Sequence, residues 1–84
     1  MEEKEIGKIV HYFDKISVGI IELSDHLKNG DKIRIKGHTS DFTEDVNSMQ
    51  IEHVNVSEAK AGDSVGIKVS QKVHQNDKVY KVTA

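Results

Sequence analysis

Apolar and polar residues alternate along most of the chain, and this period of two is typical of β-strands that bury one face. The alternation is clearest at residues 32–36 (KIRIK), where Ile33 and Ile35 face inward and the basic residues face outward. Phe42 either packs over the loop before it or opens a short strand that ends at Val46. The other predicted strands are residues 5–13, 17–23, 48–56, 64–70 and 78–83.

The alternation changes phase midway through residues 48–56 (SMQIEHVNV), where the first two apolar residues share one face and the last two share the other. One extra residue near Glu52 and His53 would turn all four inward, so the pattern predicts a β-bulge there. The next residues, 57–60 (SEAK), predict one helical turn with Ser57 as its N-cap.

The kinds of apolar residue favour the same fold class. The 84 residues include 10 Val and 9 Ile but only 2 Leu, and β-branched side chains fit a pleated sheet better than a helix. Six or seven short strands, separated by polar turns at residues 29–30, 61–63 and 75–77, are typical of a small barrel or sandwich. We therefore expect one all-β domain over residues 1–84, with its core at about residues 5–83.

The residue types exclude most catalytic chemistry. The chain has no cysteine, which rules out a disulfide scaffold, a zinc-thiolate site and a thiol nucleophile. Nucleophile-elbow and phosphate-loop motifs are absent, so we expect no catalytic residue, metal site or cofactor. The fold could still bring His38 or His53 beside a carboxylate such as Asp41 or Glu52. None of the histidines has metal-ligand spacing; they are His11, His26, His38, His53 and His74.

The chain begins Met-Glu-Glu-Lys-Glu, which lacks the basic start and apolar run of a secretory signal. No apolar stretch approaches the roughly 20 residues that cross a bilayer. These features predict a cytoplasmic protein without a membrane partner.

Charge is unevenly distributed, although the net charge is only −2. Residues 37–59 contain no Lys or Arg, whereas the strand at residues 32–36 presents three cations on one face. We call Lys32, Arg34, Lys36 and Lys68 the basic stripe. Such cations are either ordinary solvated lysines that guard a strand or contacts for a phosphate backbone.

Three segments resemble the second domain of translational GTPases such as elongation factor Tu. Residues 27–35 (LKNGDKIRI) resemble the Leu-x-x-Gly-Asp-x-hydrophobic start of a strand in that domain. Residues 57–67 (SEAKAGDSVGI) resemble its Glu-Ala-x-Ala-Gly-Asp-x-Val-Gly segment, and residues 6–10 (IGKIV) resemble its opening strand. The resemblance is strongest to small free-standing elongation-factor-like proteins. A similar barrel ends proteins of the collagenase-like peptidase family, some of whose members modify RNA.

The resemblance covers nearly the whole chain and implies a closed, mostly antiparallel β-barrel of six or seven strands with one short helical turn. The phosphate loop and base-recognition motif of the GTPase domain are missing, which excludes GTP hydrolysis and nucleotide binding. In the full factors this barrel helps to hold the acceptor end of tRNA or ribosomal RNA.

Two non-enzymatic functions are therefore expected. The first is a translation elongation factor-like module that binds tRNA or ribosomal RNA through the basic stripe. The alternative is a protein-interaction module that acts in trans with a separate enzyme subunit, such as a collagenase-like peptidase or an RNA-modification enzyme. The small net charge and the acidic stretch at residues 41–58 favour this alternative. The sequence leaves the oligomeric state open.

Overall fold

The computed structural model describes residues 2–38 and 40–83, and every regular element within them is a β-strand. Antiparallel pairing joins eight strands into one sheet in the order β5-β4-β10-β1-β2-β9-β6-β7, and β3 pairs with β8 in a small second sheet. The strands are β1 (Glu2–Phe13), β2 (Val18–Leu23), β3 (Leu27–Lys28), β4 (Lys32–Lys36), β5 (Asp41–Asp45), β6 (Met49–Ile51), β7 (Val54–Val56), β8 (Glu58–Ala59), β9 (Ser64–Lys68) and β10 (Lys78–Thr83). The all-β, antiparallel prediction is confirmed.

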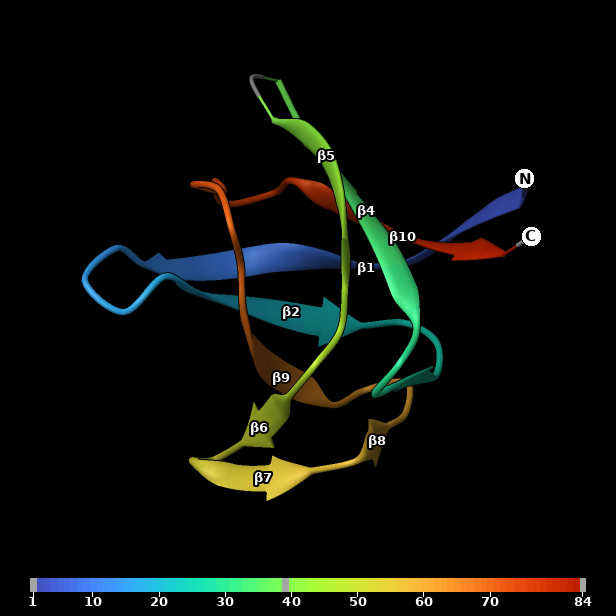
Figure 1. Cartoon of the computed structure of the whole chain (residues 1–84), viewed down its shortest axis with the longest axis vertical. Helices are drawn as coiled ribbons and strands as arrows, with labels where there is room; N and C mark the ends of the chain where they lie inside the picture. Colours follow the sequence, from blue (N-terminus) through green and yellow to red (C-terminus); the bar gives the residue numbers. More distant parts are fainter. Residues whose placement is uncertain (1, 39, 84) are drawn as a thin grey trace.

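The sheet curls around one apolar core. In Figure 1, β4 and β5 cross over β1 and β2, and the inward side chains of these strands belong to one buried cluster. In β4 and β9 the alternation in the sequence identified the inward positions correctly, because these strands bury every second residue. The largest fully buried side chains are Ile6, Ile9, Ile21, Leu27, Ile33, Ile35, Met49, Val65, Val73 and Val79.

The predicted β-bulge near Glu52 and His53 is wrong. These two residues form the turn of a hairpin between β6 and β7, with φ angles of 51° and 66°. A two-residue hairpin turn with positive φ at both positions usually contains Asn or Gly, so Glu-His carries no turn signal in the sequence. A bulge and a chain reversal both disturb the alternation, which is why the pattern alone did not separate them.

The predicted helical turn at residues 57–60 is also wrong. Glu58 and Ala59 form β8, which pairs with β3 through Lys28 and Leu27. The amide of Asn29 donates to the carbonyl of Ser57 at 2.9 Å, next to that pairing. Pairing with a distant segment, together with burial of the Ala59 side chain, outweighs the weak local preference for a helical turn.

Three turns repeat one arrangement. In residues 28–31, 60–63 and 74–77, the amide of the first residue donates to the side chain of the final aspartate, at 2.9–3.1 Å. The amide of that aspartate donates back to the carbonyl of the first residue, at 3.0–3.1 Å. The third position has positive φ in each turn, at Gly30, Gly62 and Asn76. Each turn leads directly into a core strand, which explains the Gly-Asp and Asn-Asp pairs in the sequence.

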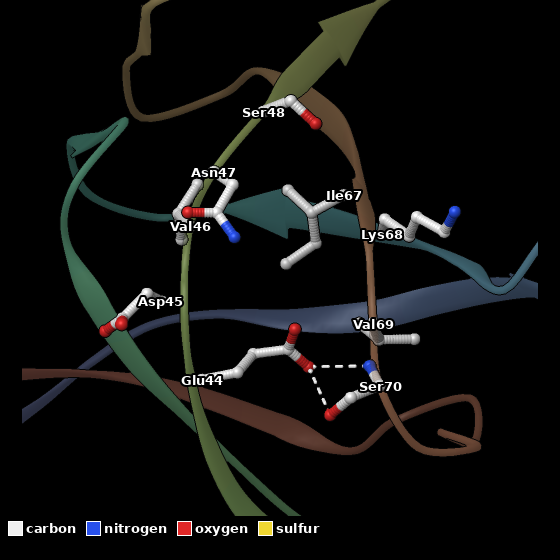
Figure 2. A pocket seen from close by; sticks show the side chains of 9 residues that line it. All are labelled: Glu44, Asp45, Val46, Asn47, Ser48, Ile67, Lys68, Val69 and Ser70. Carbon is white, nitrogen blue, oxygen red and sulfur yellow. Dashed lines mark hydrogen bonds between the residues drawn. The ribbon is translucent and has the colours of Figure 1, made fainter.

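The predicted closed barrel is not confirmed, because backbone pairing among the described residues leaves β5 at one edge of the sheet and β7 at the other. Side chains bridge the gap between β5 and the segment after β9. Glu44 Oε1 accepts from the amide and hydroxyl of Ser70, at 2.9 and 3.3 Å (Figure 2), and Ser40 Oγ donates to the Lys72 carbonyl at 3.3 Å. We call this gap the seam.

Candidate interaction surfaces

The basic stripe is only partly assembled by the fold. Lys32, Arg34 and Lys36 lie together on the outer face of β4, as predicted. Lys68 lies on β9, which β10, β1 and β2 separate from β4 in the strand order. The structure therefore brings three of the four candidate residues together.

Carboxylates neutralise the centre of this face. Arg34 Nε and Nη2 donate to Asp41 at 2.7 Å each, and Nη1 donates to Glu3 at 2.9 Å. The hydrogen bond from Arg34 lowers the pKa of Asp41 below its ordinary value, and the same bond is the main cause that raises the pKa of Arg34. Lys32 and Lys36 stand opposite Asp45 and Asp41 in the β4–β5 register. The face presents mixed charge to solvent, which weakens the case for phosphate binding.

The seam forms a groove of about 300 Å³. Figure 2 shows Glu44 directed at Ser70 across it, with Ile67 beside the gap. The Glu44 carboxylate already accepts two hydrogen bonds, so it serves here as a structural bridge. The complete lining is Glu44, Asp45, Val46, Asn47, Ser48, Ile67, Lys68, Val69 and Ser70.

The described residues contain no group of three or more His, Cys, Asp or Glu side chains that could hold a metal ion. The histidine–carboxylate pairs are His26 with Glu58 at 3.1 Å and His74 with Asp77 at 4.0 Å, and both histidines are about half exposed. No helix in the described part of the chain is long and apolar enough to cross a membrane.

A second groove, of about 340 Å³, lies on the outer face of β2, β9 and β6, and we call it the apolar groove. Val18 and Ile20 point outward because Gly19 and Ile21 occupy the inward positions of β2. Both side chains pack against Gly66 on β9, since a Cβ there would lie 3.3 Å from each of them. The remaining lining residues are Phe13, Ile16, Gln50, Glu52, His53 and Ser64.

The apolar groove lies beside the turns of two hairpins. Phe13 is 45% exposed and Ile16 is 60% exposed at the β1–β2 turn, and Glu52 and His53 of the β6–β7 turn also line the groove. Both turns hold non-glycine residues at positive φ, namely Ser17, Glu52 and His53. Such backbone conformations cost on the order of 1–3 kcal/mol each and cluster at functional sites.

The apolar groove was not predicted from the sequence. One signal was present, because adjacent isoleucines such as Ile20 and Ile21 in one strand must lie on opposite faces. The sequence could not show that Phe13 and Ile16 join Ile20 at the same end of the sheet.

The sequence of this chain is similar to segments of proteins named as a protease and a collagenase. The chain is 47% identical over 77 residues to an uncharacterized protease of Methanocaldococcus jannaschii and 33% identical over 78 residues to a collagenase of Porphyromonas gingivalis. Each alignment covers 90% of the chain but only 19% and 22% of the relative, so the chain spans about a fifth of their length. No family model matches the chain.

Solved structures show the same fold. The C-terminal domain of a candidate U32 peptidase of Geobacillus thermoleovorans superposes with a TM-score of 0.89 at 17% identity, covering 95% of this chain and 93% of that one. Its selenomethionine variant gives a TM-score of 0.86. The chain is therefore homologous to a segment of the peptidase and collagenase relatives and has the fold of that C-terminal domain. These matches support the resemblance to collagenase-like peptidases and give no support to the resemblance to translation factors.

Proposed function

We propose that this chain is a non-catalytic protein-interaction module of the U32 peptidase type, which works together with a larger peptidase portion. The observation that carries the proposal is the alignment of nearly the whole chain with only about a fifth of two proteins named as a protease and a collagenase. The alignments leave about four fifths of each relative unmatched, and we call this part the peptidase portion. In those relatives it belongs to one polypeptide with the segment that matches this chain.

The surfaces of the chain support this proposal over RNA binding. The basic stripe is interrupted by Asp41, Asp45 and Glu3, whereas the apolar groove leaves large side chains in contact with water. Contiguous exposed apolar surface is typical of a protein-binding site. Binding of tRNA or ribosomal RNA through Lys32, Arg34, Lys36 and Lys68 stays a prediction.

The experiment replaces the matching 78 residues of the Porphyromonas gingivalis collagenase with this chain and measures collagen hydrolysis. We expect no hydrolysis by the chain alone, impaired hydrolysis when the segment is deleted, and recovery in the chimera. A chimera no better than the deletion variant would contradict the proposal, and so would collagen hydrolysis by the isolated chain. The collagenase with its own segment provides the reference activity.

A further inference from the structure

We infer that the apolar groove is the surface through which the chain contacts the peptidase portion, an inference that rests on the proposed function. The occupant is a segment of that portion with a large apolar side chain, seated against Val18, Ile20 and the exposed Phe13 and Ile16. This occupant is chosen because about four fifths of each relative lies outside the segment that matches this chain, so in the relatives that segment has a large neighbour in the same polypeptide. Domains joined in one chain meet at interfaces that resemble transient protein–protein contacts.

The shape of the groove fits a protruding apolar side chain. Gly66 lines the groove, and the Val18 and Ile20 side chains pack closely over it, since a Cβ there would lie 3.3 Å from both of them. Phe13 at the end of β1 and Ile16 in the β1–β2 turn extend this apolar surface. An anchor in a depression surrounded by further apolar contacts is the usual arrangement at the centre of a protein interface.

The β1–β2 turn keeps these apolar side chains exposed, although its backbone conformation is unfavourable. The Ile16 amide donates to the Phe13 carbonyl at 3.3 Å, and this turn keeps Ser17 at a φ of 55°. The His11 ring packs edge-on against the Phe13 ring, with centroids 4.4 Å apart, and thereby restrains Phe13. An exposed apolar side chain that is held in place loses less conformational entropy when a partner covers it.

Charge also favours this face over the face of β4. The groove contains no Lys or Arg, and its charged rim residue is Glu52, beside His53. Charged residues are depleted at the cores of protein interfaces, so the apolar groove has the composition expected of one. The face of β4 carries Lys32, Arg34 and Lys36 and lacks this composition.

The absence of cysteine from the chain allows a direct test in the collagenase chimera. An Ile16→Cys variant reports on the groove, and a Gln71→Cys variant reports on an exposed position outside the groove lining. Labelling by a thiol reagent is followed by peptide mass spectrometry, both in the isolated chain and in the full-length chimera. We expect labelling at position 16 to slow by about tenfold or more in the chimera, because access then requires the interface to open, and labelling at position 71 to stay unchanged.

Equal labelling of position 16 in the chimera and in the isolated chain would overturn the inference, whatever the collagenase activity. Protection at position 71 instead of position 16 would place the contact elsewhere and leave the proposed function intact. Loss of collagen hydrolysis in the chimera would count against the proposed function. As a second readout, Ile16→Asp should lower collagen hydrolysis by the chimera while the matched Gln71→Asp should not, and equal activities would also overturn the inference.

Discussion

The turn at residues 74–77 should contribute more to stability than its two counterparts, because its aspartate is buried. Asp77 is 5% exposed, and its Oδ2 accepts from the His74 amide at 2.9 Å. The same turn is joined to β1, since the Ile9 amide donates to the Asp77 carbonyl at 2.8 Å and the Asn76 amide donates to the Ile9 carbonyl at 2.7 Å. Its carboxylate also occupies the space that a Cβ at Gly37 would need.

Asp77→Ala leaves the His74 amide without its acceptor in a partly buried position, which costs about 1–3 kcal/mol. Asp63→Ala removes the equivalent bond to the Lys60 amide at an exposed position, where water can replace the acceptor, so the cost is about 0.5–1.5 kcal/mol. The free energy of unfolding of a domain of this size is roughly 4–13 kcal/mol. The difference between the two variants is therefore large enough to measure.

Thermal unfolding followed by circular dichroism measures both variants. A loss of about 2 kcal/mol lowers the midpoint temperature by roughly 8–16 °C in a domain of this size. Asp77→Asn retains an oxygen acceptor and should lose less than Asp77→Ala. Equal losses for Asp77→Ala and Asp63→Ala would refute the reasoning, because burial would then not determine the cost of the missing acceptor.

Three further outcomes are expected. Glu44→Ala removes the hydrogen bond that the Ser70 amide donates across the seam. Hydrogen exchange at the Ser70 amide should accelerate, and the free energy of unfolding should fall by about 0.5–1.5 kcal/mol. Unchanged exchange at this amide would contradict the role of Glu44 as a bridge. The Arg34–Asp41 pair contributes stability above the ordinary Asp41 pKa of 3.8 and loses it as the pH falls through the lowered folded value. The stability difference between wild type and Arg34→Gln should therefore shrink in acid, and a constant difference would argue against the pair. If RNA binding uses the basic stripe, Lys32→Glu with Lys36→Glu should weaken binding of bulk tRNA and lower the salt slope by about 1 per lysine; unaltered binding would rule these contacts out.

Local patterns predicted those parts of the fold that short-range physics controls. Alternation at Ile33 and Ile35 identified the inward face of β4, because a strand with one buried face must place apolar side chains at every second position. The Gly-Asp pairs at residues 30–31 and 62–63 marked two of the three aspartate turns, since positive φ favours glycine. Where the local signal was weak, at Glu52–His53 and Glu58–Ala59, pairing with distant strands determined the outcome.

The charge on the face of β4 and the position of the apolar groove were less predictable from the sequence than the strands were. The outward orientation of Lys32 and Arg34 followed from alternation, but the carboxylates that neutralise Arg34 come from β1 and β5, one of them 31 positions away in the sequence. The apolar groove likewise gathers residues from two hairpins. No local pattern indicates that Phe13 and Gly66 line one depression.

The sequence by itself determined an all-β domain, the inward positions of strands such as β4 and β9, and the lack of cysteine, phosphate-loop or nucleophile-elbow chemistry, because these depend on residue type and on spacing within one strand. Only the tertiary structure decided how the seam is bridged, which cations are neutralised and where apolar side chains remain exposed. Those properties depend on which strands become neighbours and how the sheet curls. Pairing between distant segments sets both, and through them the surface that we propose contacts the peptidase.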